Sequence, residues 1–195
     1  MRRRELIKKV CLVGDSGVGK KTIAGLVAPF EKGIDKYTDK IGLAVTKYGL
    51  EFQFATQSIR LIIMIWDVTG QQEYRRLQRS YCLGAEGVIV VADASLPRSL
   101  YSLLGWIKAV RDVSGDIPAV VIVNRTAMLP EAAKTELQQS LATMLGPFNA
   151  PFYLVDAASS GVAALKAPFY ELAKRIAGRA AATPSPGEPG PSRRQ

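Results

Sequence analysis

The chain has 195 residues, of which 48% are hydrophobic, and it carries a formal net charge of +9 without any histidine. This length suffices for one domain with its own core and a tail. The lack of histidine excludes histidine-based general bases, catalytic triads and metal sites. The Lys and Arg residues are spread along the chain without the pattern of an RNA- or DNA-binding module, so no nucleic-acid partner is expected.

The predicted elements alternate between strands and helices along the chain. Apolar runs predict strands at residues 6–13, 43–54, 59–66, 87–92, 119–123 and 152–155. Between and after them, helices are predicted at residues 22–28, 72–79, 100–113, 130–144 and 163–177. This alternation predicts an α/β fold with a mostly parallel six-stranded sheet and helices on both faces. The second and third strands follow each other closely, which predicts a hairpin and one antiparallel edge strand.

The composition of the C-terminal residues and the two cysteines predict the domain bounds and the cellular compartment. Residues 1–179 are predicted to form the folded domain, and the Pro-, Gly- and Ser-rich residues 180–195 a disordered tail. The tail has no Cys for a C-terminal prenyl group, and no apolar run of about 18 residues occurs, so neither a lipid anchor nor a membrane span is expected. Cys11 and Cys82 lie in apolar surroundings, as reduced thiols do, which predicts a cytoplasmic protein.

A glycine-rich loop separates the first predicted strand from the first predicted helix. It differs at one position from the P-loop motif G-x-x-x-x-G-K-[ST], in which backbone N–H groups surround a polyphosphate. Lys20 stands where a cation meets the β- and γ-phosphates, but Lys21 replaces the Ser or Thr whose hydroxyl holds Mg²⁺. The predicted phosphate-binding residues are Asp15, Ser16, Gly17, Val18, Gly19, Lys20, Lys21 and Thr22.

A second motif follows the third predicted strand. It reads Trp-Asp-Val-Thr-Gly-Gln at residues 66–71. A carboxylate at the end of a strand, here Asp67, can hold Mg²⁺ through a water molecule. The backbone N–H of Gly70 can then reach a γ-phosphate, and Gln71 can orient a hydrolytic water.

Together the two motifs resemble those of the Ras-like small GTPases, and among these the Rab-type branch. The segments at residues 14–20, 66–71 and 81–91 are all close to Rab forms, and the resemblance covers about residues 6–178. It implies a P-loop G domain that binds GTP or GDP with Mg²⁺. It also implies a molecular switch whose two switch segments respond to the γ-phosphate and bind effector or regulatory proteins.

The resemblance also implies roles for individual residues. Lys20 and Gln71 would be catalytic, and Asp67 would be an outer-shell ligand of the metal. Asn124 would contact the base with the stem of Arg125 along it. Backbone N–H groups of Ala158, Ser159 and Ser160 would face the base oxygen.

Three departures from the family pattern leave the function open. Besides Lys21, Lys40 stands before Ile-Gly where a metal-binding Thr is expected, and Thr38 is the alternative ligand if that loop shifts. Ala127 replaces the carboxylate that accepts hydrogen bonds from guanine, and Glu131 is the nearest acid in sequence that could replace it. A GTP/GDP switch with slow hydrolysis, a pseudo-GTPase interaction module, and a P-loop protein for another nucleotide all remain possible readings.

Overall fold

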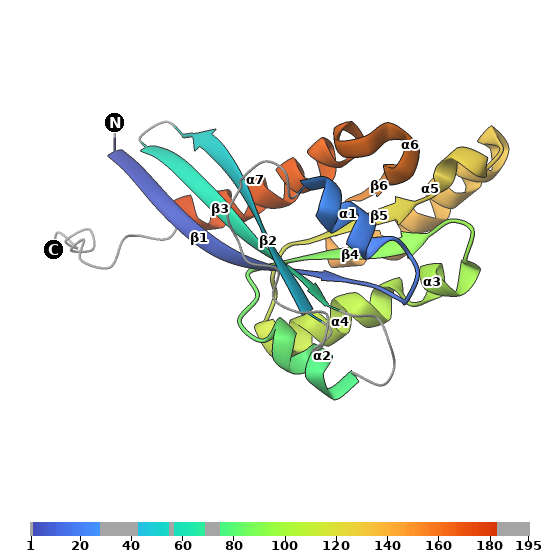
Figure 1. Ribbon diagram of the computed structural model, residues 1–195, viewed down its shortest axis with the longest axis horizontal. Coiled ribbons are helices and arrows are strands. Elements are labelled where there is room, and N and C mark those ends of the chain that lie inside the picture. The colour runs from blue at the N-terminus through green and yellow to red at the C-terminus, as the bar shows by residue number, and fades with distance from the viewer. Residues whose placement is uncertain (1, 28–42, 55–56, 69–74, 183–195) are drawn as a thin grey trace, which may run out of the picture.

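The computed structural model describes residues 2–27, 43–54, 57–68 and 75–182 of the chain. Six strands within these ranges form one sheet in the order β2-β3-β1-β4-β5-β6 (Figure 1). The strands are β1 (Arg2–Val13), β2 (Leu43–Gln53), β3 (Gln57–Val68), β4 (Gly87–Asp93), β5 (Ala119–Asn124) and β6 (Phe152–Leu154). The predicted α/β class with a six-stranded sheet is therefore confirmed.

The sheet is parallel except at one edge. β1 runs parallel to both β3 and β4, and the parallel pairing continues through β5 to β6. β2 pairs with β3 in the antiparallel sense from Leu43 opposite Val68 to Gln53 opposite Ser58, which confirms the predicted hairpin. β4 and β5 are buried at every position, as expected for continuous apolar runs covered on both faces.

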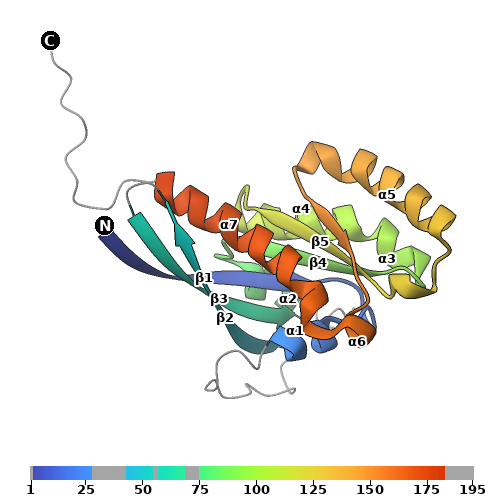
Figure 2. The same ribbon diagram turned by 90° about the horizontal axis from the view of Figure 1, so that it is seen from above.

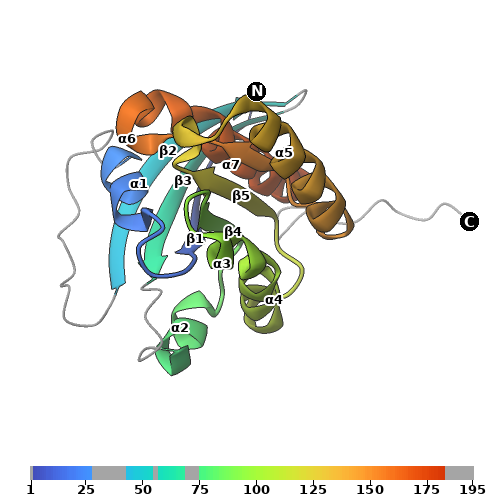
Figure 3. The ribbon, with the colours of Figure 1, turned by 90° about the vertical axis from the view of Figure 1, so that its right-hand side faces the viewer.

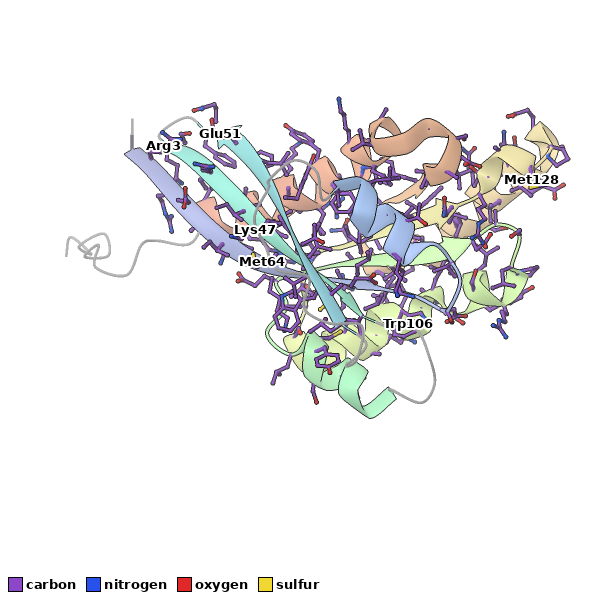
Figure 4. All side chains as sticks on the ribbon, viewed as in Figure 1. Arg3, Lys47, Glu51, Met64, Trp106 and Met128 are labelled. Carbon is purple, nitrogen blue, oxygen red and sulfur yellow. The ribbon has the colours of Figure 1, made fainter. Side chains whose placement is uncertain are left out.

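β1 begins at Arg2 rather than at residue 6, and it pairs with β3 along nearly its whole length. The prediction stopped short because residues 2–5 are charged and give no apolar signal. These residues lie at the end of the sheet where Arg3 forms a 3.1 Å ion pair with Glu51 of β2 (Figure 4). Arg4 donates a 3.4 Å hydrogen bond to the carbonyl of Ala180, so the strand is held by its neighbours rather than by its own hydrophobicity.

Helices cover both faces of the sheet, as predicted (Figure 3). Ile23 of α1 and Phe169 of α7 pack against one face, and Leu103 of α4 and Leu141 of α5 pack against the other. The helices are α1 (Lys20–Val27), α2 (Arg75–Cys82), α3 (Pro97–Tyr101), α4 (Leu103–Ser114), α5 (Glu131–Leu145), α6 (Ala157–Ser160) and α7 (Lys166–Ala182).

Two of the predicted helices are divided or extended in the structure, and the other three differ from their predicted bounds by one to three residues. The helix predicted at 100–113 is divided into α3 and α4 at Ser102, and it begins earlier because Pro97 suits the first turn of a helix. The helix predicted at 163–177 is preceded by a 3₁₀ turn, η6 (Gly161–Leu165), and α7 continues to Ala182 (Figure 2). The division of the chain at residues 179 and 180 stays a prediction, because residues 183–195 lie outside the described ranges.

None of the helices in the described ranges has both the length and the apolar composition needed to cross a membrane.

The packing of α7 on the sheet predicts a large effect for Phe169→Ala. Phe169 is fully buried, and its ring meets that of Tyr48 edge-on at 5.6 Å between centroids. Its truncation is expected to lower the free energy of unfolding by about 3–5 kcal/mol, because it leaves a cavity in a packed core. Tyr101→Ala is the control, since that side chain is 85% exposed and its loss should change stability by about 0.5 kcal/mol or less. Equal midpoints for the two variants in urea unfolding would contradict this assignment.

Candidate nucleotide-binding site

The glycine loop between β1 and α1 has a backbone that only glycine fits at two positions. Gly14 has φ +143°, and a Cβ there would lie 2.2 Å from the carbonyl oxygen of Val91. Gly19 has φ +100°, and a Cβ there would lie 2.5 Å from the side-chain nitrogen of Asn124. The loop is thus pressed against the carboxyl ends of β4 and β5, and its conformation depends on both glycines.

Lys20 folds back into this loop. Its Nζ donates hydrogen bonds of 2.8 Å to the carbonyl of Gly14 and 2.9 Å to that of Asp15, and the residue is only 7% exposed. Burial lowers the pKa of Lys20, while the charges of Asp67 and Asp15 oppose that shift. A buried ammonium held by neutral carbonyls is well placed to exchange them for the charged oxygens of a phosphate.

The side chain of Asp15 joins the loop to α4. Its carboxylate accepts a 3.0 Å hydrogen bond from the hydroxyl of Ser102 and a 2.9 Å hydrogen bond from the indole N–H of Trp106. Asp15 therefore orients the loop through its side chain. Sequence reasoning missed this contact because its partners lie 87 and 91 residues away. The other predicted loop residues are placed as follows: Ser16 and Gly17 are exposed, Val18 is buried, and Thr22 is exposed on α1.

Asp67 lies near the end of β3, opposite Leu12 of β1, and is 7% exposed. Burial raises the pKa of Asp67, and the positive charges of Lys20 and Lys21 partly offset that effect. Two ammonium groups thus act on one carboxylate beside the glycine loop. An ammonium has no lone pair, so Lys21 cannot ligate a metal ion as a Ser or Thr hydroxyl does. In the ranges that the structure describes, no group of three or more His, Cys, Asp or Glu side chains could hold a metal.

Asn124 ends β5 and connects three segments. Its amide nitrogen donates a 3.2 Å hydrogen bond to the carbonyl of Val18, and its amide oxygen accepts a 3.0 Å hydrogen bond from the N–H of Ala157. The residue is 4% exposed. The predicted base-contacting residue therefore links the glycine loop to the turn that follows β6.

The next residue, Arg125, has a positive φ of 57°. Its guanidinium forms an ion pair with the carboxylate of Asp93, at the end of β4. The other carboxylate oxygen of Asp93 accepts a 2.8 Å hydrogen bond from the N–H of Ser95. The head of Arg125 is thus fixed at β4, and the predicted placement of its stem along a base stays a prediction.

The turn after β6 is organised by Asp156. Its carboxylate accepts a 3.1 Å hydrogen bond from the N–H of Ser159, and its carbonyl accepts a 2.9 Å hydrogen bond from the N–H of Ser160. Bonds from the N–H and hydroxyl of Ser159, with smaller contributions from the N–H groups of Ala127 and Ala158, hold the pKa of Asp156 below its usual range. The N–H groups of Ser159 and Ser160 are therefore bonded to Asp156, and the predicted role of this turn in facing the base stays a prediction. Sequence reasoning passed over Asp156, although an acid just after the last strand was a visible signal.

The remaining predicted site residues cannot be placed. Thr38, Lys40, Gly70 and Gln71 lie outside the described residues. Their implied roles, as metal ligands, γ-phosphate contact and water-orienting residue, stay predictions.

The mostly parallel sheet with a glycine loop between β1 and α1 is consistent with a P-loop G domain. The chain belongs to the Ras-like small GTPases, since the family described as "Ras of Complex, Roc, domain of DAPkinase" matches residues 9–127. Membership in this family implies binding of GTP or GDP together with Mg²⁺.

The similar curated proteins include Rab-type GTPases of fungi and plants. The Ras-related protein SEC4 of Saccharomyces cerevisiae is 31% identical over 147 residues, which are 73% of this chain and 65% of that protein. SEC4 of Candida albicans is 28% identical over 180 residues, covering 90% of this chain and 80% of the relative. The Ras-related protein RABA2a of Arabidopsis thaliana is 30% identical over 145 residues, covering 71% and 62%.

The burial of Asp67 predicts an unusual pH effect. Because its pKa is raised in the folded state, ionisation of this carboxyl opposes folding, fully so above the folded pKa and not at all below the ordinary value of 3.8. Asp67→Asn is expected to raise the free energy of unfolding of the nucleotide-free protein at neutral pH. The gain should shrink as the pH falls toward about 4, as measured by urea unfolding across that range.

Asp156→Asn provides a comparison of opposite sign. The pKa of Asp156 is lowered in the folded state, so its ionised form stabilises the fold, and this contribution is lost as the pH falls through the folded pKa. The variant should be less stable than the original chain at neutral pH, with a difference that shrinks in acid. If both variants shifted stability in the same direction at neutral pH, the electrostatic account of one of the two sites would be wrong.

Proposed function

We propose that the chain binds GTP or GDP and acts as a molecular switch with slow or altered hydrolysis, through protein partners that contact its switch segments. The observation that carries the proposal is the glycine loop, closed around the buried ammonium of Lys20 with no room for a side chain at Gly14 or Gly19. Such a loop presents backbone N–H groups and one cation to a polyphosphate. The proposed location is the cytoplasm.

The proposed reaction is hydrolysis of the γ-phosphate. Water forms a bond to the γ-phosphorus, the bond from that phosphorus to the β–γ bridging oxygen breaks, and the proton of the water passes to the released phosphate. Lys20 would hold the β- and γ-phosphate oxygens and stabilise the charge that develops on them. Gly70 and Gln71 would supply the γ-phosphate contact and the orientation of water.

The charges at Lys21 support a slow or altered reaction. Lys21 acts on Asp67 from the position where the family places a metal-binding hydroxyl. Its ammonium can supply positive charge to the phosphates, but it cannot impose the octahedral geometry that Mg²⁺ brings to phosphoryl transfer. Nucleotide binding would then persist with a weaker dependence on metal.

The same residues support a second candidate, a pseudo-GTPase module that binds nucleotide weakly or not at all and uses its surface for protein contacts. Lys21 and Ala127 remove a metal ligand and a base-reading carboxylate from the family pattern. Ala127 alone would also suit a P-loop protein for another nucleotide.

Identification of the bound nucleotide distinguishes these functions. The chain, purified with and without EDTA and analysed by chromatography of the released nucleotide, is expected to carry GDP or GTP. A site that stays empty even with excess GTP and Mg²⁺ would contradict the switch and leave the pseudo-GTPase. Bound ADP or ATP would select the third reading.

A substitution at Lys21 tests its proposed role. Lys21→Ser restores the hydroxyl of the family motif and is expected to increase the effect of Mg²⁺ on GDP affinity by about tenfold or more, and to speed hydrolysis. Calorimetric titration of GDP with and without Mg²⁺, together with phosphate release from GTP, measures both effects.

Lys21→Met is the matched control, because it removes the ammonium without adding a ligand. It should weaken GDP binding in the absence of Mg²⁺ and gain nothing when Mg²⁺ is added. If Lys21→Ser and Lys21→Met behaved alike, the metal site would be lost for a reason other than Lys21, and Lys40 would be the next residue to test.

A further inference from the structure

The turn that carries Ala127 is fixed beside the end of β6. This turn is η4 (Thr126–Met128), directly after Arg125. Both the backbone N–H and the hydroxyl of Thr126 donate to the carbonyl of Val155, at 3.2 Å and 3.0 Å. The residues that follow each of these partners, Ala127 and Asp156, are therefore spatial neighbours although they are far apart in sequence.

The carboxylate of Asp156 faces this turn. It accepts a 3.1 Å hydrogen bond from the N–H of Ser159, and the N–H of Ala127 is near enough to contribute to the lowered pKa of Asp156. The side chain is only partly covered, so its oxygens keep acceptor capacity toward solvent. The adjacent residue, Ala157, is bound by the amide of Asn124, which is the base-contacting residue implied by the family. The carboxylate of Asp156 thus lies close to Ala127, the position at which the family carboxylate is missing.

We propose that Asp156 takes over the role of the carboxylate absent at Ala127 and keeps the site selective for guanine. This inference rests on the proposed binding of a nucleotide at the glycine loop. Guanine presents two donors on one edge, the ring N1–H and the exocyclic amine, and a carboxylate accepts from both. Adenine presents an acceptor at N1, which a carboxylate repels. Asp156 would therefore reject adenine as the family carboxylate at the position of Ala127 does.

Glu131 is the competing acid, and the structure places it less favourably. It lies in the first turn of α5, where its carboxylate forms a 2.7 Å ion pair with Lys134 of the same helix. Its side chain is 87% exposed. No described contact connects it to Asn124 or Ala127. The residues on either side of Asp156 are hydrogen-bonded to Asn124 and to Thr126, the neighbour of Ala127.

Asp156→Asn tests the proposal because it should change the preferred base of the site from guanine to xanthine. Asn can also accept the N-cap hydrogen bond from Ser159, so the turn is kept although it loses the stabilising charge. The amide nitrogen can donate to the O2 of xanthine, where guanine has an amine that needs an acceptor. The variant should bind GDP about tenfold or more weakly and bind XDP more tightly, with a change of about 100-fold in the ratio of the two affinities.

The measurement is calorimetric titration of the full chain with GDP, XDP and ADP, with thermal unfolding to verify the fold of each variant. Asp156→Ser is the second variant: it caps the turn without a carboxylate and should lose GDP affinity without gaining XDP affinity. Glu131→Gln is the matched control and should leave the ratio of GDP to XDP affinity unchanged.

Ala127→Asp separates this proposal from the alternative that no carboxylate reads the base in the original chain. If Asp156 already reads the base, a second carboxylate beside it should not raise the preference for GDP over ADP, while the double variant Ala127→Asp, Asp156→Ser should bind GDP as the original chain does. A GDP preference raised by Ala127→Asp, with no effect of Asp156→Asn, would overturn the proposal and leave the proposed function intact. Failure of the original chain and every variant to bind any of the nucleotides would overturn both.

Discussion

The site depends on the buried side-chain amide of Asn124. Its nitrogen and oxygen bind the glycine loop and the turn after β6 at the same time, and both bonds leave from the end of β5. Since the group is 4% exposed, losing either partner would leave a buried polar atom unsatisfied, at a cost of about 1–3 kcal/mol. The amide therefore fixes the distance between the part of the site that would hold phosphates and the part that would hold a base. Gly19 is required because the amide approaches its backbone so closely.

Charge in the phosphate part of the site is arranged for an anion. Lys20 is buried at a cost that two backbone carbonyls and Asp67 partly offset. Lys21 adds a second cation within reach of the same carboxylate. A polyphosphate would satisfy both cations, whereas a divalent metal ion would be repelled by them. The fold of a small GTPase is thus kept, and the proposed change at Lys21 concerns only the metal that would accompany the phosphates.

Local sequence patterns predicted the elements well wherever apolar runs were continuous. β4 and β5 match their predicted positions closely because every residue in them is buried, and the hairpin of β2 and β3 was visible from their spacing. The start of β1 was not predictable, because its charged residues become a strand only through pairing with β3 and contact with α7. The connection of Asp15 to Trp106 was equally hidden, since nothing in either segment indicates the other.

The sequence by itself determined the order of the elements, the glycine loop with the P-loop pattern and the residues expected to depart from the family pattern. These are short-range properties, set by which residues are apolar and by the spacing of glycine and lysine. Only the tertiary structure decided what stands beside each altered residue. The carboxyl ends of parallel strands meet at one edge of the sheet, so Lys21 comes to act on Asp67, and Ala127 comes to lie beside Asp156. The pairing of β5 with β6 brings that last acid to the site, and no pattern within either strand predicts which acid arrives.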